Sequence, residues 1–295
     1  MKQQTAKKHR KKSAEDWIVD GIAYGLLTIL VISIILPFMQ VITISMSPAS
    51  VVNESGFHLF PTEFDFSGYR IIAEDENFWH SYLVTIARTL IGTAVSVLVT
   101  VLTAYPLAKT NLPYRKGIMM FVVFTMYFSG GMIPTYLLIR GLHLTNNFLV
   151  YILPCLITGF ALIITRNFFM GIPAALEESA KIDGASNWTV LFQIYLPLSK
   201  PVMATIALWY SVEHWNAWMD NMLYVTKEKL YVLQYVLQTI LANGQGNPEE
   251  MVEVFVHTDT AKMAALVLSL IPIVCTYPFL QKYFVKGMIV GSVKG

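Results

Sequence analysis

The sequence is poor in charge and in cysteine, and both shortages limit what the protein can be. Charged residues make up 14% of its 295 residues and hydrophobic residues 55%, and the mean hydropathy is +0.54. A soluble domain carries about 25% charged residues, so the composition indicates a membrane protein. The two cysteines, Cys155 and Cys275, both lie in apolar runs. We expect them to be buried, without a disulfide or a metal site.

The sequence also lacks motifs for catalysis and nucleotide binding. It has no HExxH, GxSxG or GxxxxGK[S/T] pattern, and its one GxG, at 244–246, has no preceding strand and indicates a turn. We therefore predict a non-catalytic chain that binds no cofactor and no ATP itself. A catalytic pair of Glu213 and His214 is the weakest alternative, because neighbours in sequence point to different faces of a helix.

Six apolar segments are long enough to cross a membrane, which takes roughly 20 residues in a helix. The first follows a basic start and is too long for the core of a signal peptide, so we expect it to be retained. The pattern predicts an all-α membrane protein with a basic tail, 1–16, and one six-span domain, 17–295. The predicted spans are about 21–45, 82–108, 117–139, 147–166, 201–220 and 263–282.

Basic residues are distributed unevenly between the two sides that six spans would create. Fifteen of the 21 Lys and Arg residues lie in the N-terminal tail, in 109–117, in 166–200 and in the C-terminal tail. Because short loops rich in Lys and Arg stay in the cytoplasm, we expect both termini to lie there. Two long segments, 46–80 and 221–260, then lie outside, and loops of this length are usually functional.

One charged segment, EESAKIDGASNWTVLFQIYLP at 177–197, interrupts the apolar pattern in the middle of the chain. Pro173 suits the first turn of a helix, and Gly184 can adopt the left-handed conformation that ends one. Ser186 or Asn187 can then cap a second helix. The spacing predicts a helix, a turn and a second helix, in water against the membrane.

Within this segment, E-S-A is followed after three residues by G and after nine more by I-x-L-P. The pattern resembles the EAA loop of ABC importer permeases, with a serine in place of the middle alanine. The resemblance implies that 171–197 is a cytoplasmic coupling loop that docks on an ATPase subunit, which binds ATP and Mg²⁺. The residues implied in coupling are Glu178, Ser179, Ala180, Asp183, Gly184, Ile194, Leu196 and Pro197.

Polar residues inside the predicted spans are candidates for a translocation path, because ionisable groups in a membrane usually face a bundle interior or a wet cavity. In the fifth span, Glu213, Asn216 and Asp220 would share one face of a continuous helix. Carboxylates and amides beside aromatic rings suit sugars. The candidates are Arg88, Tyr127, Ser129, Glu213, His214, Trp215, Asn216, Trp218 and Asp220.

Simpler interpretations of these residues remain open. Arg88 can extend to the membrane interface along its aliphatic stem, and the tryptophans of the fifth span can belong to an interfacial aromatic belt. The Gly130-Gly131 pair beside Ser129 can serve close helix packing alone.

FSGGMIPTYLL at 128–138 and EHWNAWMDNMLY at 213–224 resemble carbohydrate importer permeases of the maltose-transporter type. The nearest branch serves polysaccharide fragments such as those of pectin or alginate. The resemblance implies a multi-pass permease of the bacterial inner membrane that imports oligosaccharides. The implied partners are a second permease subunit, two cytoplasmic ATPase subunits and an extracytoplasmic solute-binding protein, with no nucleic acid.

The C-terminal stretch 287–295 resembles a tail that enters the ATPase dimer.

Two alternatives for the whole chain stay open: an ABC permease for amino acids or peptides, and a self-contained channel or secondary transporter.

Overall fold

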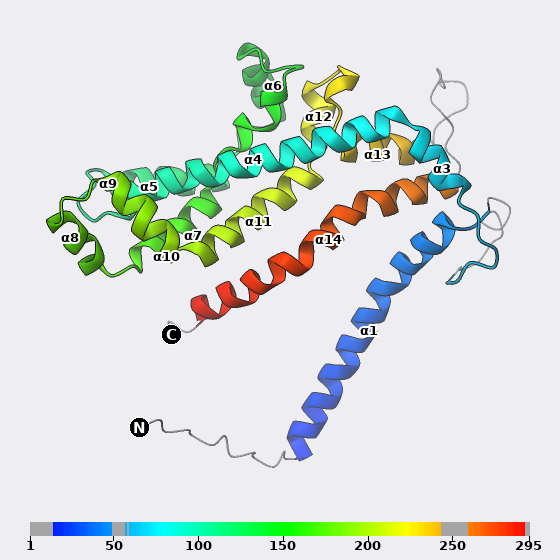
Figure 1. The fold of residues 1–295 in the computed structure, drawn as a ribbon, viewed down its shortest axis with the longest axis horizontal. Coiled ribbons are helices and arrows are strands. Elements are labelled where there is room, and N and C mark those ends of the chain that lie inside the picture. The colour runs from blue at the N-terminus through cyan, green and yellow to red at the C-terminus, as the bar shows by residue number, and fades with distance from the viewer. Residues whose placement is uncertain (1–13, 49–56, 58, 243–258, 293–295) are drawn as a thin grey trace. The chain divides into compact units, whose positions relative to one another are not determined.

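The computed structural model describes residues 14–48, 57, 59–242 and 259–292, and within them it is helical (Figure 1). For 277–292 it describes the backbone alone. The chain divides into two compact units, 1–71 with 257–267 and 72–256 with 268–295. The fold class predicted from the sequence, an all-α membrane protein, is confirmed.

The first unit contains α1 (Ala14–Ser45), most of α3 (Ser67–Glu74) and the start of α14 (Asp259–Ser292). The hydroxyls of Ser45 and Tyr69 lie 2.8 Å apart and join α1 to α3. Gly68 lies so close to α14 that a Cβ at this position would be 2.8 Å from the carbonyl carbon of Thr260. A glycine is therefore required where these two helices touch.

The second unit is organised around α4 (Glu76–Ala108), which packs along α11 (Lys200–Asn216) and α7 (Gly159–Met170) (Figure 1). Asp75 caps the start of α4 by accepting bonds from the backbone N–H groups of Asn77 and Phe78. The helix ends at Ala108, with Lys109 as its C-cap.

Shorter elements complete this unit. Near one end of α4 they are α5, α8, α9 and α10, and near the other end α12 and α13 (Figure 1). The bounds are α5 Arg115–Tyr127, α6 Met132–Gly141, α8 Ala174–Ile182, α9 Asn187–Val190, α10 Leu196–Leu198, α12 Met219–Tyr224 and α13 Leu233–Ala242, with 3₁₀ turns at Phe148–Tyr151, Leu153–Cys155 and Glu228–Leu230 and a π-helical turn at Leu191–Tyr195.

In the described residues, three helices are long and apolar enough to cross a membrane, and three bent pairs raise the number to as many as six. The third predicted span bends by 114° between α5 and α6, where Gly131 has a φ of +90°. The fourth begins as 3₁₀ turns around Pro154 and bends by 51° before α7, which Thr158 caps. Sequence periodicity cannot reveal such breaks, because the apolar pattern continues across them.

The fifth predicted span also breaks, and this corrects one expectation. Helix α11 ends at Asn216 and α12 begins at Met219, with Ala217 in an extended conformation between them. The expectation that Glu213 and Asp220 share a face of one continuous helix is therefore wrong.

The expectation of two buried cysteines is wrong. Both cysteines are free, but Cys275 is exposed and Cys155 is only partly buried. Several other expectations, for residues 1–13, 243–248 and 293–295, lie outside the described residues.

Candidate coupling loop and translocation path

The segment expected to couple to a partner is built as a helix, a turn and a second helix. Helix α8 ends at Ile182, and Gly184 follows with a φ of +83°, the left-handed conformation expected from the sequence. The N–H groups of Gly184 and Ala185 donate to the carbonyls of Lys181 and Ala180 at 3.1 and 2.9 Å. This double closure is a Schellman motif. The hydroxyl of Ser186 then accepts from the N–H of Thr189 at 3.1 Å and caps α9.

The residues of the EAA-like pattern divide into two sets. Ala180, Ile194 and Leu196 pack against a buried cluster formed by α4, α7 and the 190–195 turn. The other five are exposed, namely Glu178, Ser179, Asp183, Gly184 and Pro197. Beside them Ile182 exposes 86% of its surface. Helix α8 therefore presents a mixed polar and apolar surface that nothing in the described chain covers.

Glu177, which sequence reasoning did not select, is the best-bonded carboxylate of this loop. Its Oε2 accepts from the hydroxyl of Tyr195 at 2.9 Å and forms an ion pair with Lys109, while its Oε1 pairs with Lys181 at 2.8 Å. Burial raises the pKa of Glu177, but these bonds outweigh it and lower the pKa from 4.5 to about 2. The signal available in the sequence was the Glu177–Lys181 spacing of four residues.

Burial lowers the pKa of Lys109, while its bond and ion pair with Glu177 act in the opposite direction. The lowered pKa of Glu177 is what an ion pair produces, whereas the lowered pKa of Lys109 is the opposite of what an ion pair alone would produce. The geometry supports the charged form of both, because Lys109 also donates to Tyr195 at 3.1 Å.

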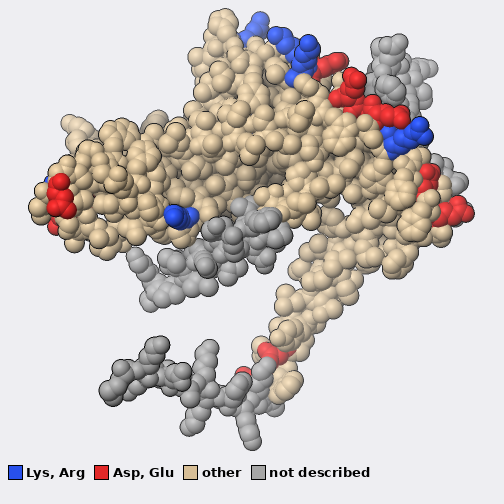
Figure 2. Space-filling view, viewed as in Figure 1, with Lys and Arg blue, Asp and Glu red and all other residues tan. Residues whose placement is uncertain are grey.

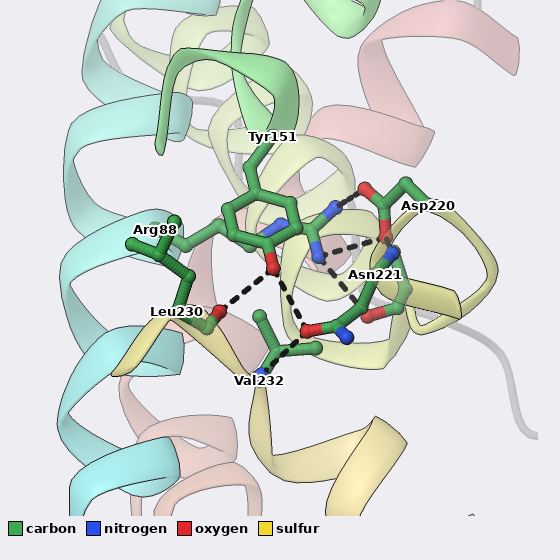
Figure 3. Close-up of polar contacts among 7 residues, drawn as sticks. Arg88, Tyr151, Asp220, Asn221, Leu230 and Val232 are labelled. Atoms are coloured by element: carbon green, nitrogen blue, oxygen red, sulfur yellow. Dashed lines mark hydrogen bonds and ion pairs between the residues drawn. The ribbon is translucent and has the colours of Figure 1, made fainter. Parts of the chain in front are cut away.

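A second polar cluster surrounds Arg88, which lies inside α4 towards its N-terminal half (Figure 3). Arg88 is 1% exposed and forms a two-pronged ion pair with Asp220, and its Nη1 also donates to the carbonyl of Ala217 at 3.1 Å. Its guanidinium lies 4.6 Å from the centre of the Tyr151 ring. Because Ala217 lies in the α11–α12 break and Asp220 in the first turn of α12, Arg88 holds that break in place.

Asn221 extends this cluster to the segment that precedes α13. Its Oδ1 accepts from the N–H of Val232 at 2.9 Å and lies 2.8 Å from the hydroxyl of Tyr151. The same hydroxyl lies 2.7 Å from the carbonyl of Leu230. The path candidate Arg88 thus belongs to an internal polar network, whose members are far apart in sequence (Figure 3).

The other path candidates fall into three sets by exposure. His214 and Trp215 are buried, Trp218 and Asp220 are partly buried, and four residues are exposed, namely Tyr127, Ser129, Glu213 and Asn216. Tyr127 and Ser129 lie at the α5–α6 break, away from the α11–α12 break in sequence. The structure brings six of the candidates to one pocket, without Tyr127, Ser129 or Trp215, namely Arg88, Glu213, His214, Asn216, Trp218 and Asp220.

Two pockets meet at Glu213. One, of about 340 Å³, is lined by Arg88 and Cys155, by Glu213 and His214, and by residues 216–220. The other, of about 600 Å³, is mainly apolar and contains Phe160 and Trp209, whose ring centres lie 4.5 Å apart. A carboxylate beside aromatic rings offers both a polar partner and an apolar face.

In Figure 2 the visible flank of the second unit between α10 and α12 is uncharged, and charged side chains gather towards its ends. This distribution suits a body whose middle lies in a lipid bilayer. No group of three or more His, Cys, Asp or Glu residues in the described part of the chain is placed to hold a metal ion.

Residues 88–290 match the protein family described as "Binding-protein-dependent transport system inner membrane component". The chain is 42% identical over 282 residues to the polygalacturonan/rhamnogalacturonan transport system permease protein YtcP of Bacillus subtilis, covering 94% of this chain and 99% of the relative. It is 43% identical to protein LplC of the same organism, covering 88% of this chain and 90% of LplC.

A solved structure is similar over almost the whole chain. It is a crystal structure of a bacterial ABC transporter involved in the import of the acidic polysaccharide alginate. The TM-score is 0.86 at 32% identity, with 93% of this chain and 99% of the other covered.

These similarities define a membrane-spanning permease component of an ABC importer. The chain belongs to the family of binding-protein-dependent transport system inner membrane components. The predictions of a non-catalytic, multi-pass inner membrane subunit and of a partner binding protein are thereby confirmed.

Proposed function

We propose that this chain is one of two permease subunits of an ATP-driven importer for oligosaccharides that carry uronic acids. The observation that carries the proposal is the 42% identity, over 94% of this chain, to a permease for polygalacturonan and rhamnogalacturonan. The similar solved transporter imports alginate, which is also acidic. Both named cargoes are polymers that contain sugar acids, so the shared chemistry is a chain of pyranose rings with carboxylates.

The cargo is tested with the complete importer in proteoliposomes, with its binding protein outside and ATP inside. We expect oligogalacturonides to stimulate ATP hydrolysis and to accumulate. Stimulation by amino acids or peptides instead would contradict the sugar cargo. Uptake that persists without ATP and collapses with the ion gradient would favour a secondary transporter.

The proposed coupling surface is the exposed side of α8 and the turn after it. Glu178, Ser179 and Asp183 are exposed there, next to the protruding Ile182. We assign this surface to a cytoplasmic ATPase subunit, with both chain termini on the same side, in agreement with the charge distribution of the loops. When ATP closes the ATPase dimer, α8 moves with its docking cleft and the spans rotate as rigid bodies. ATP drives the change only through different contacts in the two states.

Gly184→Pro tests the coupling surface. Proline cannot adopt a φ of +83° and removes the N–H that donates to Lys181. We expect the variant to insert and to lose transport, whereas Gly117→Ala, at a position with open space around it, transports normally. Normal uptake by the proline variant would contradict the role of the turn.

The proposed contribution of this chain to the path is the surface around Glu213 and Asn216. Both are exposed at the pocket beside the Arg88–Asp220 pair, and an ionisable residue in a span avoids lipid. With Cys155 and Cys275 replaced, a cysteine at position 216 should react with a water-soluble thiol reagent and be protected by cargo. The same cysteine at position 202, where Val202 is buried, is the control. If the cysteine at position 216 reacts with the thiol reagent to the same extent in every state of the importer, the assignment is wrong.

A further inference from the structure

Lys109 occupies an unusual place for a lysine at the end of a span. It is the C-cap of α4, and its side chain turns back so that Nζ lies 4.1 Å from the centre of the Tyr105 ring and 4.3 Å from that of Tyr195. The two rings meet edge to face, with centres 5.1 Å apart. Ammonium groups bind favourably to aromatic faces, so the rings form a two-sided cage that holds the lysine.

Glu177 closes this cage from a third element. The cage brings together the end of α4, the first half of α8 and the π-helical turn Leu191–Tyr195 before α10 and α11. The π turn is closed by the N–H of Leu196 bonding to the carbonyl of Leu191. Such turns are rare and often occur at functional sites. Here the turn carries Tyr195, whose hydroxyl contacts both Glu177 and Lys109.

Helix α8 has few other attachments to the described body. None of its side chains is fully buried. Its apolar contact with the buried cluster is made through Ala180 alone, supported by Ile172 before it and Ala185 after it. Small side chains make small contacts, so the bonds of Glu177 are the main directional link between α8 and α4.

We infer that Lys109, Glu177 and Tyr195 form a joint that transmits the movement of α8 to α4 and α11, and that they are positioning residues for coupling. The inference rests on the proposed function. It differs from the docking surface, because Glu178 and its exposed neighbours contact the partner while Glu177 faces the chain's own body. A force applied to α8 would otherwise bend the loop rather than rotate the spans.

The matched test compares Lys109→Met with Lys181→Met. Both remove one lysine from Glu177, but Lys181 belongs to α8 itself, is half exposed and links no second element. In the assembled importer we expect Lys109→Met to lower the amount of cargo imported per ATP by about tenfold, within the range of known coupling energies. Lys181→Met should change it by no more than about twofold. Lys109→Arg, which keeps the charge, should restore most of the coupling.

A distance measurement gives a second readout in the same complex. With both native cysteines replaced, spin labels at positions 110 and 175 report the separation of the α4 end from α8. In the otherwise unaltered chain this distance should stay the same with and without ATP, because the two elements move together. In Lys109→Met it should broaden or shift on ATP binding.

Two outcomes would overturn the joint: equal coupling in the two methionine variants, or label distances that Lys109→Met leaves unaffected. A failure of the proposed cargo is a different result. It would appear as an unaltered importer that hydrolyses ATP but is not stimulated by uronic acid oligosaccharides, and the label distances could still be measured.

Discussion

Helix α4 (33 residues) carries one ion pair at its C-terminal end and another about a third of the way along it, and the two pairs differ in burial and in what they join. Arg88 and Lys109 lie roughly 30 Å apart along the helix, at about 1.5 Å per residue, which is close to the thickness of a bilayer core. Arg88 is 1% exposed and its partner Asp220 is 19% exposed, and the pair lines one side of a pocket of about 340 Å³. The side chains of Lys109 and Glu177 are 20% and 13% exposed and lie at an open pocket of about 450 Å³.

The difference indicates separate tasks for the two pairs. The Arg88 pair fixes a break between two helices of the body, and it also bonds to the carbonyl of Ala217 and the N–H of Asn221. The Lys109 pair holds a helix with no fully buried side chain. A buried pair is costly to break and so maintains shape, whereas a partly exposed pair can hold an element that must move. The stretch of α4 between the two ion pairs packs closely on α11 and links the two pairs physically.

The largest expected effect is at Arg88. Arg88→Met leaves the carboxylate of Asp220 without its partner, and removing one member of a buried ion pair costs about 3–5 kcal/mol. We expect a low yield of inserted protein and a large fall in its thermal unfolding temperature in detergent.

A double variant separates the ion pair from packing. Adding Asp220→Asn removes the uncompensated charge, so the double variant should recover part of the lost stability. Arg88→Lys should not recover it, because an ammonium cannot reproduce the two-pronged bond or lie flat on Tyr151. If Arg88→Met alone is as stable as the unaltered chain, the Arg88–Asp220 pair does not maintain the fold, and the proposed difference between the two ion pairs is wrong.

The second effect concerns the rigid stretch of α4 between the pairs. A Cβ at Gly92 would lie 2.5 Å from Nε2 of the buried His214 on α11. Gly92→Ala should therefore force the helices apart and cost about 1–3 kcal/mol, measured as loss of thermal stability. Gly141→Ala, which meets open space, is the control, and adding His214→Ala should relieve the clash. If Gly92→Ala behaves like the control, α4 is less tightly held than this comparison requires.

The sequence predicted the helical class and the helix–turn–helix form of 177–197 because their signals are local. The turn at Gly184 depends on one residue type at one position, and its φ of +83° agrees with that reading. Hydropathy located the apolar segments well, since α4 ends at Ala108 as the predicted span does. Such features need no knowledge of distant contacts.

The polar contacts around Arg88 and around Glu177 could not be predicted, because each set joins residues from separate parts of the chain. Asp220 reaches Arg88 only because α11 ends at Asn216, and that break depends on the tertiary bond to the carbonyl of Ala217. Likewise, Tyr195 stands at the variable position of the I-x-L-P pattern, and its contact with Glu177 requires the π turn. No periodicity in the sequence marks either event.

The smallest expected effect is the pH dependence of the Glu177 joint. Its folded pKa of about 2 lies below the ordinary 4.5, so the unfolded chain binds more protons between these values. The joint therefore contributes its full stability above about pH 4.5 and loses it as the pH falls towards 2. We expect the unfolding temperature to drop by a few degrees across this range, and to drop less in Glu177→Gln, which has no carboxylate to protonate. Lys181→Met, which leaves the bonds to Lys109 and Tyr195, should retain most of the dependence. Equal slopes in the glutamine variant and the unaltered chain would mean that the Lys109 end of α4 holds α8 by packing alone.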